Sequence, residues 1–215
     1  KTPIAAMIGL LDLVDIVDEE RVPDLLDRAR RNASGLSDMV EDLLGLARAE
    51  DPDWKLAPEL CDLRETVDRV YESLEDRAMQ KNLSLETDTG LEPFMLTVDQ
   101  TCFETVLRNL ATNAVNYSRR GKISIRLRRE AGVGAVLEVE DTGPGIDPEI
   151  VPRIFERFFR GDPAHSKATG GTGLGLSIVR NLVNRMGGRI AVESVPDEGS
   201  LFRVELPENP SDPLH

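Results

Sequence analysis

Apolar residues in the first 50 positions recur at intervals of three and four, the spacing of one face of an α-helix. The acidic stretch Asp18-Glu19-Glu20 interrupts this pattern and favours a turn, and its acids also favour the start of a second helix. We therefore predict an antiparallel hairpin of two amphipathic helices over residues 1–50. Its apolar positions are Ile4, Met7, Leu11 and Val14 in the first helix, and Val22, Leu26, Ala29, Ala33, Leu36, Val40, Leu43 and Ala47 in the second.

The apolar faces of this hairpin need a partner. A lone hairpin leaves them uncovered, whereas two hairpins that pair into a four-helix bundle bury them. We therefore predict a homodimer through residues 1–50.

The pattern changes where Glu50-Asp51-Pro52-Asp53-Trp54 ends the second helix with acids and a proline. We predict a linker over residues 51–61. The single tryptophan, Trp54, is expected to pack in the joint between two domains rather than against a ligand.

Residues 62–207 mix helical and strand periodicity, which predicts a second domain, and residues 208–215 form a polar tail. Asp62-Leu63-Arg64-Glu65 is typical of a capping box and Asp99 of a helix N-cap. The expected buried helix positions are Leu63, Val67, Val70 and Leu74, then Phe103, Val106, Leu107, Leu110 and Ala114. Strands are predicted over 83–87, 94–98, 123–127, 136–139, 189–195 and 201–206, with helices after Asp147-Pro148-Glu149 and over 174–186. The fold class is α+β: the helical hairpin, then an α/β sandwich with helices on one face of a mixed sheet.

Two asparagines, Asn109 and Asn113, lie one turn apart on one predicted helix, so their side chains share a face. Asparagine is a poor residue for the middle of a helix, because its side chain competes for backbone hydrogen bonds. Two amide oxygens on one face can help to hold a hydrated Mg²⁺, a hard cation that prefers oxygen ligands. We predict a metal and phosphate function for this pair.

A predicted strand ends in Asp141-Thr142-Gly143-Pro144-Gly145. Glycine lets the backbone approach a ligand closely, and a fixed carboxylate can accept a hydrogen bond from an exocyclic amine. This combination suits the edge of a purine.

A second glycine cluster, Gly170-Gly171-Thr172-Gly173-Leu174-Gly175, runs directly into the apolar pattern of a helix. Backbone amides at a helix N-terminus favour phosphate. The segment between Arg160 and Gly173 has little periodicity and is predicted to be a mobile lid. Both glycine clusters together indicate a nucleotide site.

The order of the motifs is informative: an asparagine box, the DxGxG stretch, Phe155 and Phe158 in an FxxF pattern, and a GxGLGL cluster. This order resembles the sensor histidine kinases of two-component signalling, within the Bergerat-fold ATPases that include gyrase and MutL. Neither a G-x-x-x-x-G-K-[ST] phosphate loop nor an H-R-D or D-F-G set is present in the sequence.

The resemblance implies ATP and Mg²⁺ as cofactors. Asp141 would bind the adenine amine, with Gly143 and Gly145 in the turn beside it, Asn109 would hold Mg²⁺, and Asn113 would bind phosphate oxygens. The lid and helix start would hold the phosphates through Gly171, Thr172, Gly173, Leu174 and Gly175, while Phe155 and Phe158 would anchor the lid rather than touch ATP.

The family's phosphoacceptor motif has the form H-E-x-[RK]-[TN]-P, and Lys1-Thr2-Pro3 matches its last three positions. The resemblance therefore places the acceptor histidine three residues before Lys1, and neither His165 nor His215 takes that role. Thr2 would lie one turn after the histidine, where a threonine can orient the water that dephosphorylates a response regulator. A helix-start threonine ahead of Pro3 is the alternative.

One position departs from the family. Many relatives have a lysine three residues after the second asparagine, whereas this chain has Asn116. Arg157, Arg160 or Lys167 could restore the missing charge or could be solvated surface.

The main prediction is a histidine kinase core that passes phosphate to a response-regulator aspartate, and the alternative is a catalytically weak ATP-binding scaffold or phosphatase. A related Bergerat ATPase that is not a kinase is disfavoured by the hairpin and by Lys1-Thr2-Pro3.

Composition adds limits. The chain has 215 residues, 40% of them hydrophobic, and a formal net charge of -13, which argues against nucleic acid as a partner. Cys61 and Cys102 lack metal-ligand spacing and predict free thiols in a reducing cytoplasm. No apolar run approaches the roughly 20 residues of a membrane span. We expect a cytoplasmic protein, attached to a membrane only through further N-terminal segments of a parent protein.

Overall fold

The computed structural model describes most of the chain from Asp51 to Asn209 and part of the hairpin. The described residues are 8–10, 13, 16, 18, 21–30, 33, 36, 40, 45, 47, 51, 53–161 and 172–209.

A mixed sheet forms one layer of the main domain. Its described strands run in the order β2-β4-β5-β7-β6, with β2 and β4 parallel and the other neighbours antiparallel. Their bounds are β2 Leu83–Asp88, β4 Gly121–Glu130, β5 Gly134–Asp141, β6 Arg189–Val195 and β7 Gly199–Pro207. The predicted mixed sheet and the C-terminal hairpin are confirmed.

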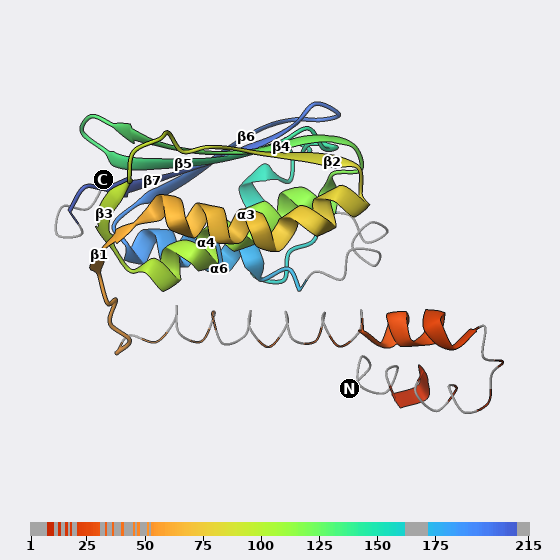
Figure 1. Cartoon of the computed structure of the whole chain (residues 1–215). Coiled ribbons are helices and arrows are strands. Elements are labelled where there is room, and N and C mark those ends of the chain that lie inside the picture. The colour runs from red at the N-terminus through yellow and green to blue at the C-terminus, as the bar shows by residue number, and fades with distance from the viewer. Residues whose placement is uncertain are drawn as a thin grey trace.

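Helices α3 (Leu63–Gln80), α4 (Gln100–Tyr117) and α6 (Gly175–Arg185) lie together on one face of this sheet (Figure 1). Each predicted helix position on the buried faces of α3 and α4 is at most 5% exposed. Helix α4 packs against both α3 and α6. The helix that carries the two asparagines is therefore fixed between two neighbours.

The N-caps explain where α3 and α4 begin. Asp99 Oδ1 accepts a hydrogen bond from Cys102 N at 3.0 Å, and Asp62 Oδ1 accepts from Arg64 N at 3.0 Å. Asp62 Oδ1 also accepts from Phe94 N at 2.8 Å, which ties the start of α3 to the chain entering β3. The N-cap roles predicted for Asp62 and Asp99 are confirmed, and the reciprocal Glu65 bond of a capping box stays a prediction.

A small second sheet was not predicted. Strand β1 (Glu59–Asp62) pairs antiparallel with β3 (Met95–Val98), so the end of the predicted linker 51–61 is a strand. The sequence hid this strand because Glu59 and Asp62 are charged and the segment is too short to show alternation. Both cysteines are free.

The predicted helix after Asp147-Pro148-Glu149 is wrong in type. A turn leads into a 3-10 helix over Val151–Arg153, with a proline at its first positions. Glu149 N donates to Asp147 Oδ1 at 2.8 Å, so the aspartate side chain makes a local turn that competes with an α-helix.

The sheet face turned away from the helices carries charges. Glu138 on β5 is 5% exposed and contacts Arg126 on β4 and Arg203 on β7, at 3.2 and 3.1 Å, and Arg128 at 2.6 Å. Burial raises the pKa of Glu138, but the hydrogen bonds from Arg128 and Arg126 outweigh it and hold the pKa below its ordinary value. The carboxylate is therefore held ionised at the centre of the sheet.

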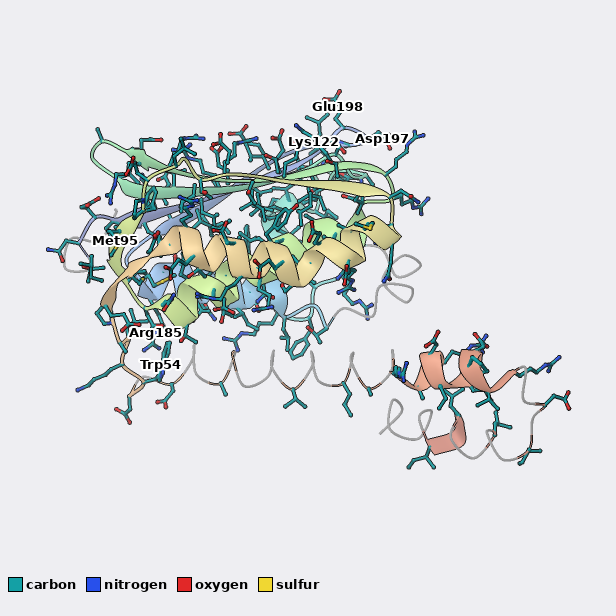
Figure 2. All side chains as sticks on the ribbon, in the orientation of Figure 1. Trp54, Met95, Lys122, Arg185, Asp197 and Glu198 are labelled. Atoms are coloured by element: carbon teal, nitrogen blue, oxygen red, sulfur yellow. The ribbon has the colours of Figure 1, made fainter. Side chains whose placement is uncertain are left out.

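Trp54 lies against the C-terminal end of α6 (Figure 2). The Arg185 guanidinium stacks over its ring at 4.8 Å, donates to Asp51 O at 2.9 Å and also bonds Trp54 O. The expectation that Trp54 packs in the joint agrees with this contact. In the same view Lys122, Asp197 and Glu198 gather at the opposite end of the sheet.

The described hairpin residues agree with the predicted helices: residues 8–10 and 22–30 are helical, and Ile16 is in a turn. Leu25 and Ala29 are buried within the hairpin, whereas Leu26 and Val40 of the predicted apolar pattern are 38% and 48% exposed. Leu25 and Ala29 are four residues apart and share a face, from which Leu26 is turned by about 100°.

Candidate nucleotide site

Helix α4 positions both asparagines. Asn109 Nδ2 donates to Thr105 O at 2.9 Å, which fixes the amide. Its oxygen points at the start of α6, because a Cβ added to Gly175 would lie only 2.5 Å from Asn109 Oδ1. Asn113 lies one turn further along α4 and is partly exposed. The structure thus brings the asparagine box against the second glycine cluster.

Asp141 ends β5 between Ile123 of β4 and Ser200 of β7. Its Oδ1 accepts a hydrogen bond from Gly143 N at 2.8 Å. Burial raises the pKa of Asp141, the backbone N–H groups of Gly143 and Ser200 oppose this shift, and the charge of Glu140 adds to it. The result is a half-buried carboxylate with its pKa above the ordinary value.

The turn after Asp141 requires its glycines. Gly145 has φ +66°, and a Cβ there would lie 2.1 Å from Val195 O. The loop is also tied to β6, because Ile146 N donates to Ser194 Oγ at 2.8 Å. Glycine at this position therefore lets the loop pack on the neighbouring strand.

The second cluster is locked to the FxxF segment. Gly173 has φ +74°, its carbonyl accepts from Phe158 N at 2.9 Å, and a Cβ there would meet Phe158 and Phe159 backbone atoms at 2.9 to 3.0 Å. Leu174 is 1% exposed, and its N–H donates to Thr172 Oγ1 at 3.1 Å. Leu174, the N-cap of α6, makes no side-chain capping hydrogen bond, and the N–H groups of a helix start that lacks one can bind an anion.

Phe158 does not pack in the core, and most of the lid that it was predicted to anchor lies outside the described residues. Phe155 and Phe159 pack against the core, whereas Phe158 is 64% exposed with φ +59°. The positive φ redirects the chain, so the spacing that the sequence shows no longer sets which ring faces inward.

Sequence reasoning missed two cations beside Asn116. Arg77 Nη2 on α3 donates to Asn116 Oδ1 at 2.6 Å, and Lys81 Nζ donates to Asn116 O at 2.8 Å and Val115 O at 2.6 Å. Burial, and then the charge of Arg77, lower the pKa of Lys81. No sequence motif marks either residue, because the contact joins helices 39 positions apart.

Some of the predicted site residues are not placed at the site by the described structure. Thr2 and Gly171 lie outside the described residues, as do Lys167, His165 and His215. Arg160 is described and exposed at the end of its segment. Within the described part of the chain, no group of three His, Cys, Asp or Glu side chains could hold a metal.

Helices α3, α4 and α6 on one face of a mixed sheet, with α4 beside two glycine loops, make up the α/β sandwich of Bergerat-type ATPases (Figure 1). Comparison with protein families agrees. Residues 98–210 match the family described as histidine kinase-, DNA gyrase B- and HSP90-like ATPases, and residues 1–52 match the His Kinase A (phospho-acceptor) domain. The chain belongs to the sensor histidine kinase family.

Similar proteins include the sensor-like histidine kinase SenX3 of Mycobacterium tuberculosis, 39% identical over 213 residues, with 96% of this chain and 51% of SenX3 covered. Among solved structures, histidine kinase AdeS of Acinetobacter baumannii is 30% identical with a TM-score of 0.72, covering 97% of this chain and 96% of AdeS. ShkA, solved with AMPPNP, is 27% identical with a TM-score of 0.74, covering 97% of this chain and 44% of ShkA.

The chain spans about half the length of the SenX3 sequences that it matches. In the part of the chain that the structure describes, no helix is both long and apolar enough to cross a membrane.

Proposed function

We propose that this chain is the core of a sensor histidine kinase that binds Mg-ATP and transfers the γ-phosphoryl group to a histidine, from which a response-regulator aspartate takes it. The observation that carries the proposal is the contact of Asn109 Oδ1 with Gly175 at the uncapped start of α6. An amide oxygen and free helix N–H groups at one point suit a metal and its phosphates.

The residues present fit Mg²⁺, because an amide oxygen is a hard ligand that needs no deprotonation. Asn109 would hold the ion and Asn113 would bind phosphate oxygens. When bound, Mg²⁺ neutralises charge on the phosphates. Asp141 would accept from the adenine amine, and Gly173 and Gly175 would offer backbone N–H groups. The Leu174 N–H already donates to Thr172 Oγ1, so Leu174 would take part through its place at the helix start.

The proposed transfer moves phosphorus from oxygen to nitrogen. A histidine nitrogen forms the new bond to the γ-phosphorus, the bond from that phosphorus to the β–γ bridging oxygen breaks, and ADP leaves with the electron pair. The chain's own residues need only position the groups and stabilise charge, which is how phosphoryl transfer is usually catalysed. The acceptor predicted three residues before Lys1 remains a prediction.

We further propose a homodimer through the hairpin and a response-regulator receiver domain as partner, in the cytoplasm. The match of residues 1–52 to the phospho-acceptor domain supports both. Leu26 and Val40 are 38% and 48% exposed and offer apolar surface to a second hairpin. A solved relative, ThkA, is in complex with the response regulator TrrA; it is 23% identical and supports the fold alone.

A second candidate function is a catalytically weak ATP-binding scaffold or a phosphatase toward the regulator. The observation in its favour is Asn116, whose side-chain oxygen is occupied by Arg77 at 2.6 Å. A neutral residue there lacks the positive charge that a lysine supplies in many relatives. A phosphatase role would rest on Thr2.

Asn113→Ala tests the proposed site. We expect Mg-ATP affinity, measured by calorimetry, to fall at least tenfold, because a hydrogen bond to charged phosphate is lost while the partly exposed position tolerates alanine. The matched control is Asn184→Ala, an exposed asparagine of α6, which should bind like the wild type. Unchanged affinity in Asn113→Ala would refute the role of this residue.

Labelled ATP separates the two candidate functions. The chain is incubated with [γ-³²P]ATP, with and without a histidine-containing helical bundle added in trans. Label on the bundle supports the kinase, and its absence despite tight Mg-ATP binding supports the scaffold or phosphatase. Label on the chain alone would contradict the predicted position of the acceptor.

A further inference from the structure

The hydroxyl of Ser118 stands out at the C-terminal end of α4. Ser118 is fully buried, and among the described residues its Oγ is the buried side-chain nitrogen or oxygen without a hydrogen-bond partner. Native proteins pair nearly all such groups, because an unpaired buried hydroxyl is costly. An unpaired buried hydroxyl beside a ligand site therefore calls for a role.

The backbone of Ser118 is fixed on three sides. It is the C-cap of α4, its N–H donates to Ala114 O at 3.1 Å, and its carbonyl accepts from Lys81 Nζ at 3.3 Å. The hydroxyl can therefore move only by rotation about its own χ1.

The hydroxyl shares a space with the Asp141 carboxylate. A Cβ added to Gly143 would lie 3.0 Å from Ser118 Oγ and 2.7 Å from Asp141 Oδ1, so both oxygens border the point that glycine leaves open. The carboxylate already accepts backbone N–H groups from Gly143 and Ser200. The Ser118 hydroxyl borders the same small space and has no hydrogen-bond partner in the described part of the chain.

Few charges act on this carboxylate. Its neighbours across the sheet are Ile123 on β4 and Ser200 on β7, and the charged group next to it on β5 is Glu140. Because Glu140 disfavours a second negative charge, only neutral donors oppose burial. Each hydroxyl or N–H donor therefore helps to keep the Asp141 carboxylate ionised.

We propose that Ser118 is a positioning residue for nucleobase binding: its hydroxyl donates to the Asp141 carboxylate and holds it ionised and oriented toward the exocyclic amine. This inference rests on the proposed nucleotide function. Helix α4 would then contribute to both parts of the site. Asn109 and Asn113 would bind the metal and the phosphates, and Ser118 at its C-terminal end would orient the carboxylate that binds the base.

The test is Ser118→Ala in the full chain, with ATP affinity measured by calorimetry between pH 4.5 and 8. Loss of one hydrogen bond should weaken binding at pH 7 by about 3- to 10-fold. Without the donor the pKa of Asp141 rises, so the affinity should fall off at a pH about half to one unit higher than in the wild type. Superimposable curves would overturn the proposal.

A second readout separates this inference from the nucleotide function. The ¹³C carboxyl signal of Asp141, assigned with Asp141→Asn, is titrated in the nucleotide-free chain, where Ser118→Ala should move its midpoint upward. If the wild type fails to bind ATP, the proposed function fails, and this titration still decides the inference. An unmoved midpoint refutes it.

A purely structural role would look different. If Ser118 acts on Asp141, Ser118→Ala should move the carboxyl titration of the nucleotide-free chain while changing its thermal midpoint little. The matched control is Ser73→Ala on α3, whose hydroxyl donates to Val70 O at 2.7 Å and which should change neither affinity nor titration. A lower thermal midpoint in Ser118→Ala together with an unmoved titration would assign Ser118 to stability alone.

Discussion

The sandwich and the hairpin differ in how much of their apolar surface is buried within the chain. In the sandwich, Phe103, Val106 and Leu107 of α4 are fully buried within one chain. In the hairpin, Leu26 and Val40 stay 38% and 48% exposed although they belong to the apolar pattern. The same spacing of three and four therefore has two outcomes, which depend on whether other elements of the same chain cover the helix.

This difference teaches where each region obtains its stability. The sandwich closes its core with a sheet and neighbouring helices, so it can hold a site rigidly by itself. In the hairpin, Leu26 and Val40 remain exposed, and we propose that a second hairpin covers them. A signalling kinase of this design would keep its nucleotide site fixed while the hairpin responds to a partner.

The largest expected effect comes from the same truncation in both regions. Leu107→Ala should reduce the free energy of unfolding of the sandwich by about 2–5 kcal/mol, since it leaves a cavity in a closed core. Leu26→Ala should leave that free energy unchanged and instead weaken dimerisation. Urea unfolding and analytical ultracentrifugation measure the two quantities. Equal losses of sandwich stability would break the comparison.

Glycine substitutions come next. Gly145→Ala should cost about 1–3 kcal/mol of sandwich stability, because its φ of +66° and the Val195 carbonyl both oppose a Cβ. Gly132→Ala, with φ +80° and no atom within 4 Å of the new Cβ, isolates the cost of the backbone angle. Gly9→Ala, in a helical part of the hairpin with an open surrounding, should be neutral or stabilising. Circular dichroism melts rank the three variants.

The charged sheet face gives a smaller, pH-dependent effect. The pKa of Glu138 is lowered by folding, so its contribution is present above the ordinary value of 4.5 and is lost as the pH falls through the folded value. Glu138→Gln should cost about 1–2 kcal/mol at pH 7 because solvent screens the partly exposed arginines. The difference from the wild type should shrink below pH 4.5 in unfolding experiments. Asp24→Asn, whose exposed partner is Arg28 at 3.1 Å in the hairpin, should change little at either pH.

The smallest effect lies between the two regions. Trp54→Ala removes the ring under Arg185 and should cost less than about 1 kcal/mol of unfolding free energy, because the Arg185 bond to Asp51 O remains. The visible consequence should be faster proteolysis within residues 51–61. Arg185→Ala removes the ring contact and the hydrogen bonds together, so it should accelerate cleavage further. Equal cleavage rates in all three proteins would show that this contact does not hold the joint.

The parts of the site that depend on residue type and short spacing could be predicted from the sequence. The asparagine pair, the acid at a strand end and the glycines before a helix are all defined by residue type and short spacing, and the described ones occupy the elements expected of them. The exposure of Phe158 could not be predicted, because a positive φ cannot be seen in a spacing of aromatic residues. The contact of Arg77 with Asn116 was missed because it joins two helices whose relative placement no local pattern encodes.

The sequence alone therefore determined the helical hairpin, the mixed helix and strand order, the N-caps Asp62 and Asp99 and the family motifs. These depend on periodicity and on hydrogen bonds between near neighbours. Only the tertiary structure decided the pairing of β1 with β3, the contact of Asn109 with Gly175 and the position of Ser118 beside Asp141. Such contacts arise when distant segments pack against a common core, and the information for them is spread over the whole chain.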